Sequence, residues 1–317
     1  MMNNIVLPAR NAAGAVATGI SDYADKGWLP IVHDASLELN VITNAFTGKF
    51  DGGNFFVDNF YINRSDANYA GLFGATSGAV ISNTGIRGSA SPAVTGGRFA
   101  GALAGYIQGG SVTRCYAHVA VRCEGNVSTA TAVFAGGLLG MLSGDASLSA
   151  SYSSGNVSGL PSAGAILQIG GLAGSLQGAA SSIRNCFASG NIDAGSGVVI
   201  FGGGLAGTLS VSIANCYAAG NVACTSQSAQ SINLGALGGI IGDAVAHTNC
   251  YRNSGAAITA NGQPATLKDA SIATPKTKAE MQDDAFKNLL NHGASVWGRD
   301  SGKNDGLPYI IGVGVGR

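Results

Sequence analysis

GGGLAGTLSVSIANCYAAGNV, residues 202–222, contains two blocks that recur along the chain. The first block, GGLAG, ends here at Gly207, and its counterparts end at Gly74, Gly105, Gly140, Gly174 and Gly242, so that one unit is 31 to 35 residues long. The second block, ANCYAAGNV, has the counterparts TRCYA, SASYS, RNCFASGNI and TNCYRN in the other units. A fixed order of two markers at one period indicates a repeat architecture.

Each unit is made of short segments rather than long ones. Runs of about four to six β-branched or small residues are separated by Gly, Ser and Asn, a pattern typical of strands joined by turns, and amphipathic stretches of helical length are missing from the units. The sequence therefore predicts an all-β fold, a parallel β-solenoid in which each unit is one coil and equivalent strands stack at about 4.8 Å. A right-handed β-helix is expected, because parallel crossovers are nearly always right-handed.

Stacking of equivalent positions predicts columns of like side chains. The internal aliphatic column is expected to hold Leu72, Leu103, Leu138, Leu172, Leu205 and Ile240. A second column just upstream is expected to hold Tyr69, Phe99, Phe134, Ile169, Phe201 and Leu234. A third, of packed rings, is expected to hold Tyr116, Tyr152, Phe187, Tyr217 and Tyr251. The Gly-Asn pairs at 155–156, 190–191 and 220–221 suit left-handed turns, with Asn side chains bonding one coil to the next.

The glycines at 202, 204 and 207 also satisfy the spacing of a dinucleotide-binding turn, G-x-G-x-x-G. That motif must lead into a helix and be followed about twenty residues later by an acidic residue. Here a strand-like segment follows and no acidic residue stands at that distance. The glycines are therefore assigned to the repeat, and no cofactor is expected.

Composition narrows the function classes. The 317 residues include 50 Gly, 46% are apolar, 11% are charged and the formal net charge is zero, so that a basic face for nucleic acid cannot be assembled. Gly and Ser interrupt every long uncharged stretch, so that no membrane insertion is expected. The N-terminus lacks the basic and apolar segments of a secretory signal, which predicts either a missing leader or another export route.

Four of the six cysteines precede an aromatic residue of the third column: Cys115, Cys186, Cys216 and Cys250, with Ser151 in the remaining unit. Adjacent coils would place them within disulfide range, so that one bridge, Cys186 to Cys216 or Cys216 to Cys250, is an alternative to a ladder of buried thiols. We favour buried thiols. A metal site is not expected, because C-x-x-C pairs are missing and the four histidines are scattered.

Catalysis on this scaffold would need converging carboxylates. Asp145 and Asp193 stand at different points of neighbouring units, and Arg122 and Glu124 lie near one turn of an earlier coil. Isolated turn residues are the favoured interpretation, and a polysaccharide lyase or hydrolase is kept as a minor alternative.

The blocks GGLAG, SIRNCFASGNI and SIANCYAAGNV resemble the GLUG repeats of bacterial surface and adhesin-like proteins, which also occur beside IgA-specific metallopeptidases. The flanking stretches FTGKFDGGNFFVDNFYI (46–62) and VWGRDSGKNDGLPYI (296–310) resemble the entry and closing segments of such regions. The resemblance implies an extracellular β-solenoid with an adhesive role and without catalytic residues. The H-E-x-x-H motif of metallopeptidases is missing from this chain.

Three regions are predicted: an N-terminal cap and entry coil (1–64), six GLUG-type coils (65–256) and a C-terminal cap (257–317). The cap contains the capping-box pattern Thr277-x-x-Glu280 and one apolar helical face, which predict an amphipathic helix over 278–290 that covers the last coil.

The resulting expectation is a non-enzymatic extracellular module that binds a cell-surface glycan, a protein receptor or neighbouring copies of itself. A phage tail or fibre component is the alternative, which would place the chain in a virion. Segments 143–150 and 223–233 are candidate binding loops.

Overall fold

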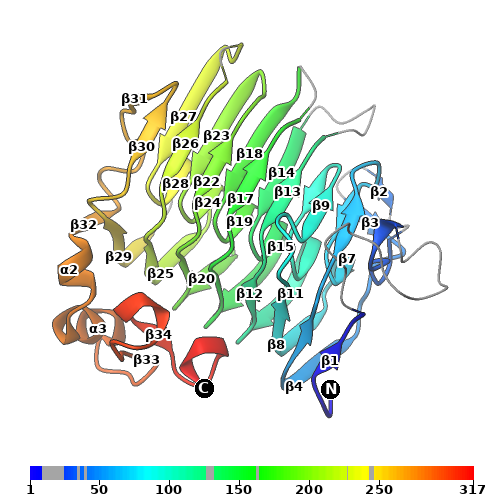
Figure 1. Ribbon diagram of the computed structural model, residues 1–317, viewed down its shortest axis with the longest axis horizontal. Coiled ribbons are helices and arrows are strands. Elements are labelled where there is room, and N and C mark those ends of the chain that lie inside the picture. The colour runs from blue at the N-terminus through cyan, green and yellow to red at the C-terminus, as the bar shows by residue number, and fades with distance from the viewer. Residues whose placement is uncertain are drawn as a thin grey trace.

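The computed structural model describes residues 1–8, 25–33, 36–38, 41–125, 132–161, 164–226, 228–242 and 246–317. These residues form a stack of coils that runs from the N-terminal strands on the right of Figure 1 to the last coil on the left. Strands of successive coils pair in parallel, and through most of the stack each coil continues the register of the one before. The expected all-β, parallel β-solenoid with a short C-terminal helix is confirmed.

Three sheets line the stack in the described part of the chain. The six-stranded sheet contains β6 (Tyr69–Ala70), β10 (Phe99–Ala100), β14 (Ala132–Gly136), β18 (Ile166–Gly170), β23 (Val199–Gly203) and β27 (Ser231–Gly235). The eight-stranded sheet contains β5 (Ile62–Arg64), β9 (Val94–Gly96), β13 (Val121–Cys123), β17 (Val157–Gly159), β22 (Ile192–Ala194), β26 (Val222–Cys224), β30 (Ile258–Ala260) and β31 (Gln263–Pro264).

The largest sheet contains β1 (Ile5–Val6), β4 (Lys49–Asp58), β7 (Phe73–Ser77), β8 (Val80–Arg87), β11 (Ala104–Thr113), β12 (Tyr116–His118), β15 (Leu139–Ser149), β16 (Tyr152–Ser153), β19 (Ala173–Leu176), β20 (Ser182–Arg184), β21 (Phe187–Ala188), β24 (Ala206–Leu209), β25 (Ser212–Ala218), β28 (Gly238–Ile241), β29 (His247–Asn253) and β32 (Thr274–Lys276). Two small antiparallel pairs stand apart, namely β2 (Ser36–Glu38) with β3 (Val41–Thr43) and β33 (Trp297–Gly298) with β34 (Tyr309–Ile310).

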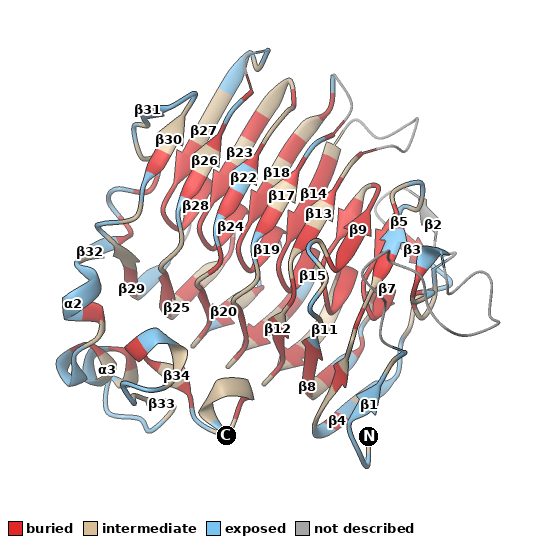
Figure 2. Ribbon diagram, in the orientation of Figure 1, coloured by how far each residue is buried: buried red, intermediate tan, exposed pale blue. Residues whose placement is uncertain are grey.

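A continuous apolar core fills the interior, visible as the buried strands of Figure 2. Its first column holds Leu72, Leu103, Leu138, Leu172 and Leu205, none more than 4% exposed. The sixth member is Leu237 and not Ile240, because the Leu205 N–H donates to the Leu237 carbonyl and Thr208 lies opposite Ile240. The assignment of Ile240 is therefore wrong. The last block is GALGG, ending at Gly239, and Ile240 is half-buried on the outer face.

The second column is an outer one. Tyr69, Phe99 and Phe134 lie in register in β6, β10 and β14, and their rings stack outside the core. Gln168, Phe201 and Asn233 continue the row in β18, β23 and β27. The expected members Ile169 and Leu234 lie one residue further along and point inward, since successive strand residues face opposite sides of a sheet.

The left-handed residues lie six positions before the expected asparagines, within the same marker. Positive φ angles of 50° to 54° are found at Asn185, Asn215 and Asn249, directly before the cysteines, whereas the Gly-Asn pairs have ordinary φ values. Gly190 is required for another reason, because a Cβ at this position would overlap the Gly155 carbonyl oxygen of the preceding coil. The expected bonds between coils are present, since the Asn156 and Asn191 side-chain oxygens accept from the N–H groups of Asn191 and Asn221 at 2.9 and 3.0 Å.

Residues 263–276 close the C-terminal end of the stack. β31 turns back on β30, and β32 pairs with β29. The carboxylate of Asp269, which is fully buried, accepts hydrogen bonds from the N–H groups of Ala236, Leu237 and Gly238. In the coils before, the corresponding N–H groups donate to carbonyls of the next coil. Asp269 therefore supplies the acceptors that a further coil would provide.

The predicted helix exists but is broken and lies elsewhere. α2 (Lys278–Met281) begins at the expected capping box of Thr277 and Glu280, and α3 (Asp284–Asn291) begins at a second N-cap, Asp283, so the helix over 278–290 is two short ones. Together with the 3-10 turns η1 (Asn304–Gly306) and η2 (Gly314–Gly316), they pack beside the coils and not over the last one. This C-terminal segment, residues 277–317, lies below the stack in Figure 1.

Candidate functional site: the side of the solenoid and its cleft

The cysteines lie inside the coils. All six are free thiols and buried, and Cys216 pairs in register with Cys250. Burial raises the pKa of the Cys115 and Cys250 thiols to about 12 and that of Cys216 well above its usual value. Because the thiolate is the nucleophile and the metal ligand, these protonated side chains act as small apolar core residues.

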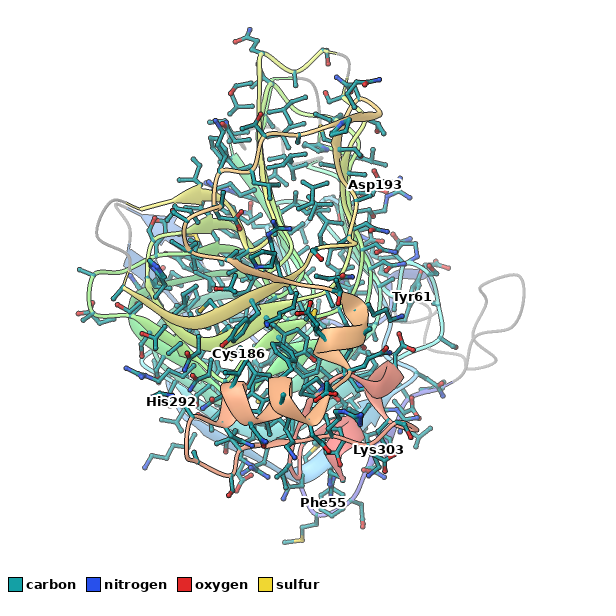
Figure 3. All side chains as sticks on the ribbon, turned by 90° about the vertical axis from the view of Figure 1, so that its left-hand side faces the viewer. Phe55, Tyr61, Cys186, Asp193, His292 and Lys303 are labelled. Atoms are coloured by element: carbon teal, nitrogen blue, oxygen red, sulfur yellow. The ribbon has the colours of Figure 1, made fainter. Side chains whose placement is uncertain are left out.

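The structure separates the carboxylates considered for catalysis. Asp145 lies in β15 and accepts from the N–H of Ala180, whereas Asp193 is exposed on β22 in a different sheet, on the upper part of the stack in Figure 3. Arg122 and Glu124 form their own ion pair at 3.3 Å. Among the described residues, no three His, Cys, Asp or Glu side chains gather as a metal site would require. The candidate loop 143–150 lies almost entirely within β15.

The aromatic column lies on the outside of the solenoid and is covered by the C-terminal segment. Tyr116, Tyr152, Phe187 and Tyr217 stack with ring centroids 4.4 to 5.5 Å apart. Tyr251, in register with Tyr217, meets the ring of Phe286 edge-on at 5.0 Å. Met281, Leu290, Trp297, Leu307, Ile310 and Val313 complete the apolar layer between the coils and the segment.

Polar contacts attach the segment to several coils at once. The Tyr217 hydroxyl donates to the Pro308 carbonyl at 2.6 Å, and the N–H of Val315 donates to the Tyr152 hydroxyl at 3.0 Å. Arg114, from an early coil, donates to the Gly312 carbonyl at 3.0 Å. The segment thus returns from the last coil toward the first ones along the side of the stack.

His118 is a partly buried titratable group whose pKa is lowered beside the aromatic column. Its Nε2 lies 2.7 Å from the Tyr152 hydroxyl, and its pKa falls from 6.5 to about 4, chiefly because of burial and additionally because of the nearby Arg87. In the unfolded chain His118 is protonated near pH 6.5, whereas in the folded chain it is protonated only near pH 4. Acidification from pH 6.5 to pH 4 is therefore expected to destabilise the fold through His118, by up to about 3 kcal/mol.

We expect this contribution to disappear in His118→Gln, which keeps a hydrogen-bonding group beside Tyr152. Urea unfolding of both proteins between pH 7 and pH 4 measures it. The wild type should lose more stability over this range than the variant, and parallel pH profiles would contradict the assignment.

A cleft opens where the C-terminal segment meets the eight-stranded side of the coils. This side cleft has a volume of about 320 Å³. Its rim carries an ion pair between Lys278 Nζ and Asp305 at 2.6 Å, which joins α2 to η1. Its lining residues are Ser189, Asn191, Ala219, Gly220, Asn221, Asn253, Gly255, Ala256, Lys278, Met281, Asn304, Asp305 and Leu307.

The side cleft has a row of amide donors. The side-chain oxygens of Asn191 and Asn221 accept from the N–H groups of Asn221 and Ala257, at 3.0 and 2.8 Å. Both residues are exposed. With the oxygens committed to the solenoid, the side-chain NH₂ groups are the parts left to bind a ligand, one per coil. Sequence reasoning identified these asparagines as coil-to-coil bonds but did not place them in a cleft, because the C-terminal segment that forms the opposite wall is remote in sequence.

Comparison with known proteins agrees with this architecture. Residues 167–193 match the family model described as "The GLUG motif". No curated protein matches the chain. Among solved structures, one described as a "putative immunoglobulin A1 protease from Bacteroides ovatus" is similar with a TM-score of 0.61 and 21% identity, over 84% of this chain and 77% of that one. At this identity the similarity concerns the fold. No described helix is long and apolar enough to cross a bilayer. Residues 167–193 therefore carry the GLUG motif that the repeat blocks resemble.

Proposed function

We propose that this chain is a non-enzymatic, extracellular binding module of the adhesin type, and that it holds a saccharide in the side cleft. The observation that carries the proposal is the row of NH₂ donors of Asn191 and Asn221 on the wall of a cleft of about 320 Å³. The GLUG motif supports the extracellular setting through its resemblance to surface proteins.

The chemistry of the side cleft favours a hydroxyl-rich ligand. Amide groups hydrogen-bond to hydroxyl and ether oxygens, and their repetition from coil to coil suits a ligand that is itself a repeating chain. Among the described residues of its lining, Lys278 is the only cation, and it is already paired with Asp305, so a neutral ligand meets no unbalanced charge there. The separation of Asp145 from Asp193 on different sheets supports binding without turnover.

The matched pair Asn191→Asp and Asn156→Asp tests the proposal. Both substitutions keep the side-chain oxygen that accepts from the next coil, and both remove an NH₂ donor. Only Asn191 lines the side cleft. A glycan array screened with the full chain supplies the polysaccharide, and calorimetry then compares the variants. We expect Asn191→Asp to lose at least tenfold in affinity and Asn156→Asp to bind like the wild type.

Three results would contradict the proposal. If Asn191→Asp and Asn156→Asp lose ligand affinity equally, the asparagine amides serve only the structure of the solenoid and not ligand binding. A failure of every polysaccharide on the array to bind would remove the ligand class. Release of reducing ends or unsaturated sugars from a bound polysaccharide would make the chain an enzyme.

A further inference from the structure

The Gly-rich bend of each coil creates a second surface, on the opposite side of the stack from the eight-stranded sheet. The six-stranded sheet meets β7, β11, β15, β19, β24 and β28 at this bend. The rings of Phe99 and Tyr106 stack across the bend at 5.2 Å, so the outer faces of the two sheets face each other. We call the outward residues on both sides of the bend the corner surface. It comprises Tyr69, Phe99, Phe134, Gln168, Phe201 and Asn233 on one side, and Tyr106, Gln108, Gln177 and Ile240 on the other.

The chain itself covers the N-terminal half of the corner surface. Ile42 of β3 is only 6% exposed and packs with Tyr69, Phe99, Tyr106 and Phe134. The Ile42 N–H donates to the side-chain oxygen of Gln108, which lies on β11 two residues after Tyr106. This half therefore shows what the corner surface accepts: a branched aliphatic side chain against stacked rings and a main-chain N–H on a glutamine oxygen.

The C-terminal half repeats these elements without a covering segment among the described residues. Phe201 is half-buried in the row that contains Phe134, and Ile240 is half-buried on the other side of the bend. Gln177 follows Leu176, the register partner of Leu142, and so continues the row of Gln108 and Ser143. A ring, an aliphatic side chain and a glutamine are thus also present in this half, contributed by three successive coils.

Two acceptors in this half lack partners within the described chain. The side-chain oxygen of Gln168, next to Phe201 in register, is buried and accepts no hydrogen bond. Gln177 donates through Nε2 to the Ser175 hydroxyl at 2.9 Å, which leaves its side-chain oxygen to accept. A buried acceptor without a donor is costly, because the group has lost water without replacing it. The Ile42 N–H on Gln108 is the precedent for a main-chain donor to a glutamine oxygen of this row.

We propose that the C-terminal half of the corner surface binds an extended polypeptide segment of a partner protein. A branched aliphatic side chain packs on Phe201 and Ile240, and a main-chain N–H donates to the side-chain oxygen of Gln177. The site is separate from the side cleft, so a partner protein and a saccharide bind the module independently. Ile42 of β3 occupies the same surface further toward the N-terminus and serves as the internal precedent.

The probe for this site is a library of random peptides of about twelve residues displayed on phage and selected on the full chain. The affinity of a recovered synthetic peptide is then measured for the wild type, Phe201→Ala, Gln177→Ala and the cleft variant Asn191→Asp. We expect recovered peptides to carry Ile, Val or Leu. The two corner variants should each weaken binding at least tenfold, and Asn191→Asp should leave it unchanged.

Phe201 and Gln177 are both partly exposed, and thermal melts verify that the variants are folded. Unchanged peptide affinity in Phe201→Ala and Gln177→Ala would overturn the proposal. A polysaccharide that shifts the amide resonances of β18 and β23 while no recovered peptide does so would also overturn it, by assigning the surface to a saccharide. If the side cleft binds no saccharide, only the role assigned to Asn191 is lost, and the peptide affinities of Phe201→Ala and Gln177→Ala still test the corner surface. The two proposals therefore fail separately.

Discussion

Leu172→Asp is expected to abolish the folded state. Leu172 is fully buried in the aliphatic column, and its N–H donates to the Leu205 carbonyl. Loss of the leucine side chain alone costs about 2–5 kcal/mol, and burial of an unpaired carboxylate adds several more. The sum reaches the total stability of an ordinary domain, about 5–15 kcal/mol.

Circular dichroism and gel filtration of purified Leu172→Asp should show loss of the strand signal and an expanded or aggregated chain. Leu172→Met is the control, because a volume-conserving apolar exchange costs less than about 1.5 kcal/mol. Wild-type melting of the aspartate variant would refute the internal column at this position.

Asp269→Ala should have the second-largest effect. The substitution removes the acceptor of three buried N–H groups in the last coil, and each unsatisfied donor costs about 1–3 kcal/mol. Removal of a buried charge offsets part of this loss, so we expect a net destabilisation of about 2–4 kcal/mol. Urea unfolding measures it.

Asp300→Ala is the matched control for this prediction. Asp300 is an exposed turn aspartate that accepts from one N–H, that of Gly302 at 2.8 Å, and its removal should change stability by less than about 0.5 kcal/mol. Amide hydrogen exchange locates the effect. In Asp269→Ala, protection against exchange should fall first at the amides of residues 236–238. An equal loss of protection in all coils would argue against a capping role for Asp269.

The repeat determines how much of the fold is predictable. Five of the six aliphatic positions follow directly from blocks with one Gly-aliphatic pattern, because stacking forces equivalent residues into one column. The sixth fails because GALGGIIG contains two overlapping candidates, and only the hydrogen bond from Leu205 to Leu237 decides between them. Period length cannot separate alternatives that are three residues apart.

Orientation and long-range partners are less accessible from the sequence. The column of Tyr116 and Tyr152 is apolar whether it faces the core or an outer layer, so its composition does not reveal that the C-terminal segment covers it. Asp269 stands in a charged stretch with no local signature of a cap. The side cleft and the corner surface both depend on segments that meet only in three dimensions, and the repeat alone does not predict either of them.

The C-terminal segment changes how the stack comes apart. A solenoid is nearly one-dimensional, since each coil touches only its neighbours and its ends can fray independently of the middle. Here one segment contacts Tyr251 in the last coil, Tyr152 in the middle and Arg114 near the start. Coils that never touch are thereby coupled, and fraying of the C-terminal coil must first release a layer that the early coils also hold. We therefore expect the array to unfold as one cooperative unit and not as a series of separately melting repeats.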